Sequence, residues 1–190
     1  MWRYLADKVG ATVLALSQLM LTNVAGTDPS FQEVRLELRG SGIHVSTVLM
    51  DSFTEDLDIM LQSGDTLVVH FEVDLVLAEN DSIVAMANWH HQFRYSLLED
   101  RYHLFFSEEG EWDNIYSFED ARQRWVQINE AYLCEMELLQ PRHRYYLRLS
   151  AYMDNVQLPG LTEQLNLMSF WNRIRPSYKS PPFEKRSLIL

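Results

Sequence analysis

Cysteine is nearly absent from this sequence, since Cys134 is the only one among 190 residues. A single cysteine excludes an intramolecular disulfide and any metal site that is built from several thiolates. Apolar residues flank Cys134 in an alternating pattern, so we predict a small buried residue on a β-strand. A nucleophilic role would need a nearby base, and the sequence indicates none.

Glycine is also scarce, with seven in the chain, and the motifs that depend on it are missing. The sequence has no G-x-S-x-G, no phosphate-binding loop, no G-x-G-x-x-G and no H-E-x-x-H. We therefore expect a protein that is not an enzyme and that takes no cofactor.

Positively charged residues are few: the chain has 16 basic and 27 acidic residues, which gives a net charge of −11. This balance repels nucleic acids and anionic membranes, so we expect no nucleic-acid partner. The C-terminal end is the exception, where the basic residues outnumber Glu184: Arg173, Arg175, Lys179, Lys185 and Arg186. We expect a solvated basic tail over residues 176–190, outside the packed body, with a contact arm as the alternative.

Long apolar runs are missing as well, and the longest one lies near the start of the chain. Val9–Leu21 has 13 residues and is shorter than the roughly 20 residues that span a bilayer core. Arg3 and Lys8 precede it, and Val24 and Gly26 supply small residues at a cleavage site. This pattern predicts a signal peptide over residues 1–26 and a periplasmic or secreted protein without a transmembrane span. An amphipathic N-terminal helix is the alternative.

Period-two alternation of apolar and polar residues dominates the rest of the chain and predicts half-buried strands. Val34 to Leu49 forms one hairpin around Gly40-Ser41-Gly42. His70 to Leu97 forms a longer hairpin that turns at residues 79–82, and Tyr145 to Met153 alternates in the same way.

Two short helices interrupt these strands. One is expected from Phe53 to Gln62 with Ser52 as its N-cap, the other from Phe118 to Asn129 with Ser117 as its N-cap. The chain is thus predicted to be mainly β (α+β), an antiparallel β-sandwich of roughly seven to eight strands with two inserted helices. Residues 27–175 would form its single domain.

Polar residues gather on one side of the longer hairpin. His70, Glu72 and Asp74 share the polar face of one strand, and either Asn88 or His90 lies opposite Glu72, depending on register. His70, Glu72, Asp74 and His90 are acceptable zinc ligands, but the favoured interpretation is a solvated polar face.

Neighbouring patterns have structural interpretations too. His91 falls among apolar positions and is predicted to be a core histidine with a local hydrogen bond. The acidic run from Glu108 to Asp113 lacks the spacing of a calcium loop and is expected to be a solvated hairpin tip.

Tyr146 and Tyr152 lie beside Arg148, off the apolar face of their strand. Tyrosine and arginine are enriched at interface hot spots, so these three residues are a candidate partner surface. The alternative is that the C-terminal segment covers them.

Four stretches occur in a characteristic order: the first helix ending before Gly64, Phe93 to Tyr102, Ser117 to Ala121, and Tyr145-Tyr146-Leu147-Arg148-Leu149 through Leu158-Pro159-Gly160 to Trp171. In this order the sequence resembles the bacterial exported proteins grouped as domain of unknown function 4390. The resemblance implies export and a β-rich fold, with no assigned activity and no catalytic residue.

Our leading hypothesis is a non-enzymatic exported β-sandwich that binds another protein of the cell envelope. One alternative is a small-ligand carrier, with a pocket between the sheets or under residues 161–171. The other is a metal-dependent enzyme that uses His70, Glu72, Asp74 and His90.

Overall fold

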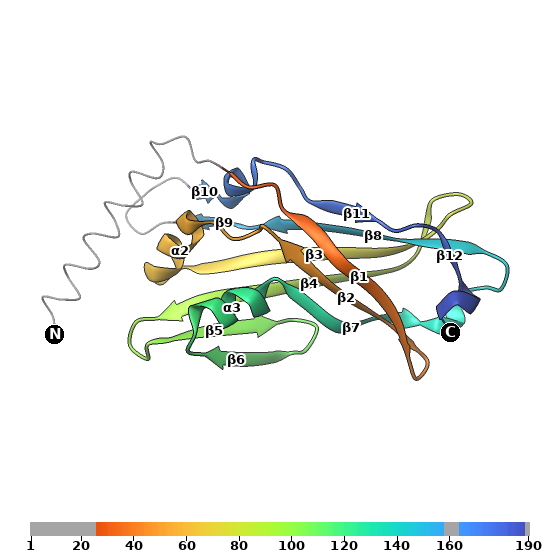
Figure 1. The fold of residues 1–190 in the computed structure, drawn as a ribbon, viewed down its shortest axis with the longest axis horizontal. Helices are drawn as coiled ribbons and strands as arrows, with labels where there is room; N and C mark the ends of the chain where they lie inside the picture. The colour runs from red at the N-terminus through yellow and green to blue at the C-terminus, as the bar shows by residue number, and fades with distance from the viewer. Residues whose placement is uncertain (1–25, 158–163, 189–190) are drawn as a thin grey trace, which may run out of the picture.

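The computed structural model describes residues 26–157 and 164–188. Two antiparallel sheets pack face to face around one apolar core, which confirms the mainly β, sandwich-like fold (Figure 1). The predicted signal peptide and the turn at residues 158–160 lie outside the described residues. Within the described ranges, no helix has the length and apolar character that crossing a membrane requires.

The smaller sheet has three strands in the order β1-β2-β7: β1 (Ser30–Arg39), β2 (Gly42–Met50) and β7 (Gln127–Glu135). The hairpin predicted around residues 40–42 is confirmed, since Arg39 pairs with Gly42 and Leu38 with Ile43. Gly40 turns the chain with a φ of 59°, a conformation that glycine adopts without a steric penalty.

The larger sheet has seven strands in the order β11-β8-β3-β4-β5-β6, with β12 also paired to β8. Its members are β3 (Thr66–Leu77), β4 (Ser82–Ser96), β5 (Arg101–Phe106), β6 (Glu111–Ile115), β8 (Arg144–Met153), β11 (Ser177–Lys179) and β12 (Phe183–Glu184). A separate ribbon joins β9 (Asn155–Gln157) and β10 (Gln164–Asn166). The described strands outnumber the predicted ones because several are too short to show alternation.

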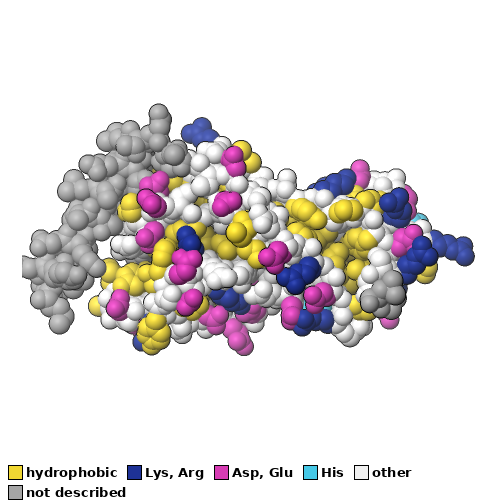
Figure 2. Space-filling view, in the orientation of Figure 1, with side chains coloured by type: hydrophobic (Ala, Val, Ile, Leu, Met, Phe, Trp, Pro, Cys, Tyr) yellow, Lys and Arg dark blue, Asp and Glu magenta, His cyan; other side chains and the backbone are white. Residues whose placement is uncertain are grey.

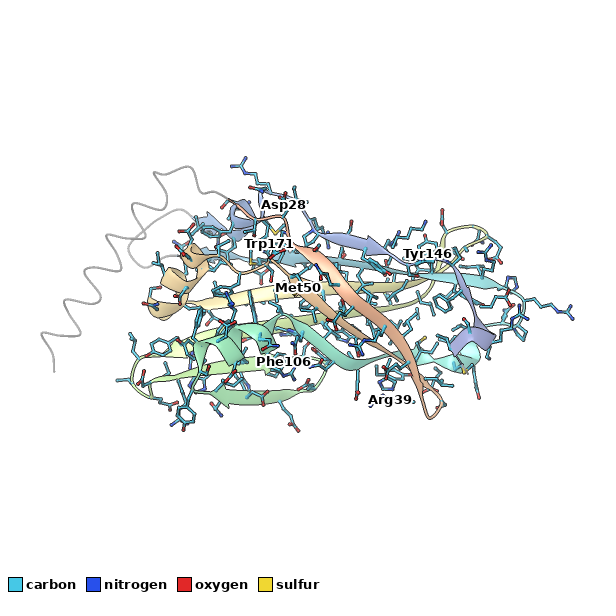
Figure 3. The ribbon with its side chains drawn as sticks, in the orientation of Figure 1. Asp28, Arg39, Met50, Phe106, Tyr146 and Trp171 are labelled. Atoms are coloured by element: carbon cyan, nitrogen blue, oxygen red, sulfur yellow. The ribbon has the colours of Figure 1, made fainter. Side chains whose placement is uncertain are left out.

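The core lies between the two sheets and follows the alternation of the sequence. On β3, Val69, Phe71 and Val73 are buried, whereas the residues between them are only half-buried and face the other way. Phe106 of β5 and Trp171 are fully buried among these side chains (Figure 3). One face of the larger sheet thus packs against the smaller sheet, and the opposite face is left for other contacts.

The first helix, α2 (Glu55–Gln62), begins two residues later than expected. Thr54 is its N-cap and accepts a hydrogen bond from the Leu57 amide, whereas the Ser52 hydroxyl donates to the Leu49 carbonyl. Phe53 precedes the helix, and its ring packs 5.8 Å from that of Trp125. The backbone is extended at Thr54 and becomes helical only from Glu55, so the prediction of Ser52 as the cap was wrong.

The second helix, α3 (Phe118–Trp125), has the predicted cap, since Ser117 accepts from the Asp120 amide at 3.3 Å. The helix ends four residues before the predicted end at residue 129. Gln127 already pairs with Val48 of β2, so Ile128 enters the core from a strand and not from a helix.

The C-terminal segment belongs to the sheet, which corrects the prediction of a tail outside the packed body. Ser180 makes two hydrogen bonds with Leu147 of β8. The Ser180 hydroxyl accepts from the Leu147 amide, and the Ser180 amide donates to the Leu147 carbonyl. The edge of β8 that faces away from β3 needs such partners for its backbone groups. The prolines beside β11 and β12 fit this edge position, where a missing amide donor is tolerated.

Candidate functional site

The outer face of the larger sheet, which points away from the smaller sheet, brings two predicted groups of residues together. His70 on β3 lies opposite Tyr152 on β8 and opposite His90 on β4. Asp74 lies opposite Arg148 in the same way. The polar cluster and the candidate partner surface are therefore parts of one continuous surface.

The residues of the polar cluster His70, Glu72, Asp74 and His90 are largely engaged by neighbouring side chains. Glu72 lies opposite Asn88, which decides the register that the sequence left open, and Asp74 accepts two hydrogen bonds from Arg148 at 3.0 and 2.7 Å. The ring of His70 lies 2.9 Å from a carboxylate oxygen of Asp154. Among the described residues, no group of three or more His, Cys, Asp or Glu is arranged to hold a metal ion.

The electrostatics of this cluster follow from those pairs. The hydrogen bond from Arg175 is the largest cause that lowers the pKa of the Glu72 carboxyl. Burial lowers the pKa of the His90 imidazole, and the nearby charge of His70 lowers it further. The cluster therefore carries an ionised carboxylate and a neutral imidazole at neutral pH.

Five rings form a row across the outer face, one from each of five neighbouring strands: Tyr152, His70, His90, Phe105 and Trp112. Successive ring centroids lie 4.6, 5.9, 5.6 and 5.2 Å apart. The Arg175 guanidinium lies 4.7 Å from the Tyr152 centroid and also pairs with Glu72 on β3. The ring row is thus fixed at one end by a cation, and Trp112 at the other end is 55 % exposed.

The candidate partner surface is only partly accessible. Tyr146 is buried: its hydroxyl donates to Asp81, and the Lys179 ammonium lies 3.9 Å from its ring centroid. The alternative that the C-terminal segment covers these aromatics therefore holds for Tyr146. Trp112 and Met86 are instead among the large exposed apolar residues of the outer face. The sequence contained a signal for Met86, because it alternates with Ala85 and Ala87 of the apolar face.

A hollow of about 340 Å³ opens on the outer face beside the ring row. Its lining residues are His70, Phe71, Glu72, Asn88, Trp89, His90 and Tyr152. Its polar side chains are a carboxylate, two imidazoles, an amide and a phenol. The hollow can offer hydrogen bonds and ring edges to a ligand.

A histidine–carboxylate pair, His91 and Glu108, is buried in the core. The His91 ring lies 2.6 Å from the Trp125 carbonyl and 2.6 Å from a Glu108 carboxylate oxygen. His91 is fully buried, which confirms the predicted core histidine, and the Glu108 side chain is 2 % exposed. The predicted solvated tip is thus wrong at Glu108, because the His91 ring draws this carboxylate inward.

Cys134 is buried on β7, as predicted for a small residue on a strand. Burial raises the pKa of its thiol to about 11. A thiol with this pKa is almost entirely protonated at neutral pH, so it is a poor nucleophile.

The fold and the outer face define the class of this protein: an antiparallel β-sandwich whose larger sheet presents a row of fixed rings to the solvent. The family model described as Domain of unknown function (DUF4390) matches residues 27–179, and the chain belongs to this family. The resemblance drawn from the sequence is thereby confirmed. Among curated proteins and among solved structures, none matches the chain.

Proposed function

We propose that this chain is an exported, non-enzymatic binding protein of the cell envelope that contacts another protein through its outer face. The observation that carries this proposal is the exposed Trp112 at the end of the ring row. Tryptophan, tyrosine, methionine and arginine are the residues in which protein interfaces are enriched. Rings that already pack on one another lose little side-chain entropy when a partner binds.

A broad protein contact suits this face better than a small ligand. The Tyr152 ring already stacks on the His70 ring and contacts the Arg175 guanidinium, so little of its surface is left for a ligand to stack on. The hollow beside the ring row is close to the lower limit of small-molecule pockets, which are also mostly apolar. Export is supported by the pattern of residues 1–26.

Substitution at the exposed end of the ring row tests the proposed interface. Trp112→Ala should weaken capture of a partner from envelope extract by about 30-fold, the loss typical of an interface hot spot. Tyr132→Ala is the matched control, because Tyr132 is also half exposed but lies on the smaller sheet. Equal binding by both variants and the wild type would refute the interface.

Intact mass after cell fractionation tests export separately. We expect a mass that corresponds to residues 27–190 in the periplasmic or secreted fraction. A full-length mass in the cytosol would overturn export.

A further inference from the structure

The basic residues of this chain are distributed very unevenly. Residues 142–190 carry eight basic and three acidic residues, a net charge of +5. Residues 1–141 carry eight basic and 24 acidic residues, a net charge of −16. Such an asymmetry within one domain indicates a surface that attracts anions on a body that repels them.

The fold gathers these cations along one edge of the larger sheet. They come from β8, β11, the short helix η3 (Lys185–Leu188) and the segments before β8 and after Trp171, and we call the following six residues the basic edge: Arg142, Arg144, Arg173, Lys179, Lys185 and Arg186. Lys and Arg side chains gather at the end of the molecule where β12 lies (Figure 2). The ten residues of β8 give this edge a length of about 33 Å.

Five of the six cations have no carboxylate within salt-bridge distance among the described residues; only Arg186 has one, from Glu184. The nearby acids have other partners, because Glu79 contacts His143 and Asp81 accepts from Tyr146. Outside the basic edge, Arg94 is the one arginine of the described part of the chain without a salt bridge, whereas seven others are paired: Arg35, Arg39, Arg101, Arg122, Arg124, Arg148 and Arg175. The basic edge therefore keeps its charge available for an external anion.

The basic edge also has a hollow that could bind an anion and an exposed apolar side chain. Arg142, Lys185 and Arg186 line one hollow of about 290 Å³, together with Pro141 and Glu184. Ile174, between Arg173 and Arg175, is 49 % exposed. Cations beside exposed apolar side chains are the combination that binds the interface of an anionic membrane.

We propose that the basic edge docks this protein on an anionic phospholipid surface, with a lipid phosphate in the hollow at Arg142, Lys185 and Arg186. Cations distributed along one sheet edge can meet a flat anionic surface together, and the acidic remainder of the chain is repelled from that surface, so the sheet would stand edge-on. Trp112 then lies at the far edge, five strand spacings or about 24 Å away. The docking does not depend on the proposed function, because the two surfaces share no residue.

Vesicle co-sedimentation of the full chain tests this docking. The wild type should bind vesicles of phosphatidylcholine and phosphatidylglycerol in equal parts but not vesicles of phosphatidylcholine alone, and added salt should weaken binding. The variant Arg142→Gln/Arg173→Gln/Lys185→Gln should bind about 100-fold less, since each cation near an anionic surface contributes about fivefold. Residues 1–25 are present in the wild type and in every variant, so any contribution they make to vesicle binding is the same in all of them.

The matched control is Arg35→Gln/Arg94→Gln/Arg122→Gln, which changes the net charge by the same amount away from the basic edge. It should bind anionic vesicles like the wild type. Equal losses in both variants, or wild-type binding that does not respond to phosphatidylglycerol, would overturn the proposal. Binding to heparin without binding to vesicles would overturn it as well and would assign the basic edge to a soluble polyanion.

Discussion

Replacement of His91 by leucine is the sharpest test of how the core is held together. Both nitrogens of the buried ring have hydrogen-bond partners, the Trp125 carbonyl and the Glu108 carboxylate. Phe71 and Phe106 pack on the ring with centroids at 4.8 Å, which excludes water from it. His91→Leu keeps the apolar packing and removes both hydrogen bonds.

The expected cost of His91→Leu comes mainly from the carboxylate that it leaves behind. Removing one partner of a buried pair costs about 3–5 kcal/mol, because the remaining charge has no compensation. The other oxygen of Glu108, Oε2, has no hydrogen-bond partner among the described residues, so the carboxylate has little other support. For a chain of this size the loss corresponds to a fall in Tm of about 6–20 °C.

Urea unfolding followed by circular dichroism measures this effect in a double-mutant cycle. His91→Leu/Glu108→Leu removes both members of the pair and should be less destabilised than His91→Leu, with a remaining loss of about 1–3 kcal/mol because the Trp125 carbonyl still lacks its donor. Glu109→Leu is the matched control on the same hairpin; it breaks a partly exposed pair with Arg124 and should cost at most about 1 kcal/mol. A loss below about 1 kcal/mol in His91→Leu, or additive losses in the double variant, would refute the reasoning.

Three further predictions follow from single features. The buried thiol of Cys134, with its pKa of about 11, should resist iodoacetamide at neutral pH in the folded protein and react in urea; fast labelling of the folded protein would contradict its burial. An NMR titration should place the pKa of His90 below the ordinary 6.5, and His70→Gln should raise it because a neighbouring positive charge is lost; an unchanged value would leave burial as the sole cause. Deletion of residues 176–190 removes three hydrogen bonds from Leu147 and Ala151 at about 1 kcal/mol each, so Tm should fall by several degrees, and an unchanged Tm would contradict the pairing of β11 with β8.

Local pattern predicted the strands well where alternation was long. The hairpin of β3 and β4 follows directly from its period-two sequence, because each side chain there faces either the core or the outer face. The N-cap at Ser117 was also visible, since a cap depends only on residues close in sequence.

The errors arose where distant residues decide the local structure. Ile128 fits a helical stripe, yet β2 recruits this segment into a strand. The charges and prolines of the C-terminal segment are typical of a solvated end, but this segment pairs with the open edge of β8 through β11 and β12. Glu108 lies in an acidic run and is buried by His91, a residue 17 positions away. A sequence read in short windows carries no information on such partners.

The position of β3 at the centre of the larger sheet has a consequence for the order of folding. One neighbour, β4, follows it after a short turn, but the other neighbour is β8, so Val73 finds Leu149 only late in synthesis. In the same way β2 must wait for β7. Pairings between distant segments fold slowly, because a long loop must close before any contact forms. A nascent chain that ends before Arg144 therefore lacks the strand that completes its core, and it remains without a stable fold until most of the protein has been made.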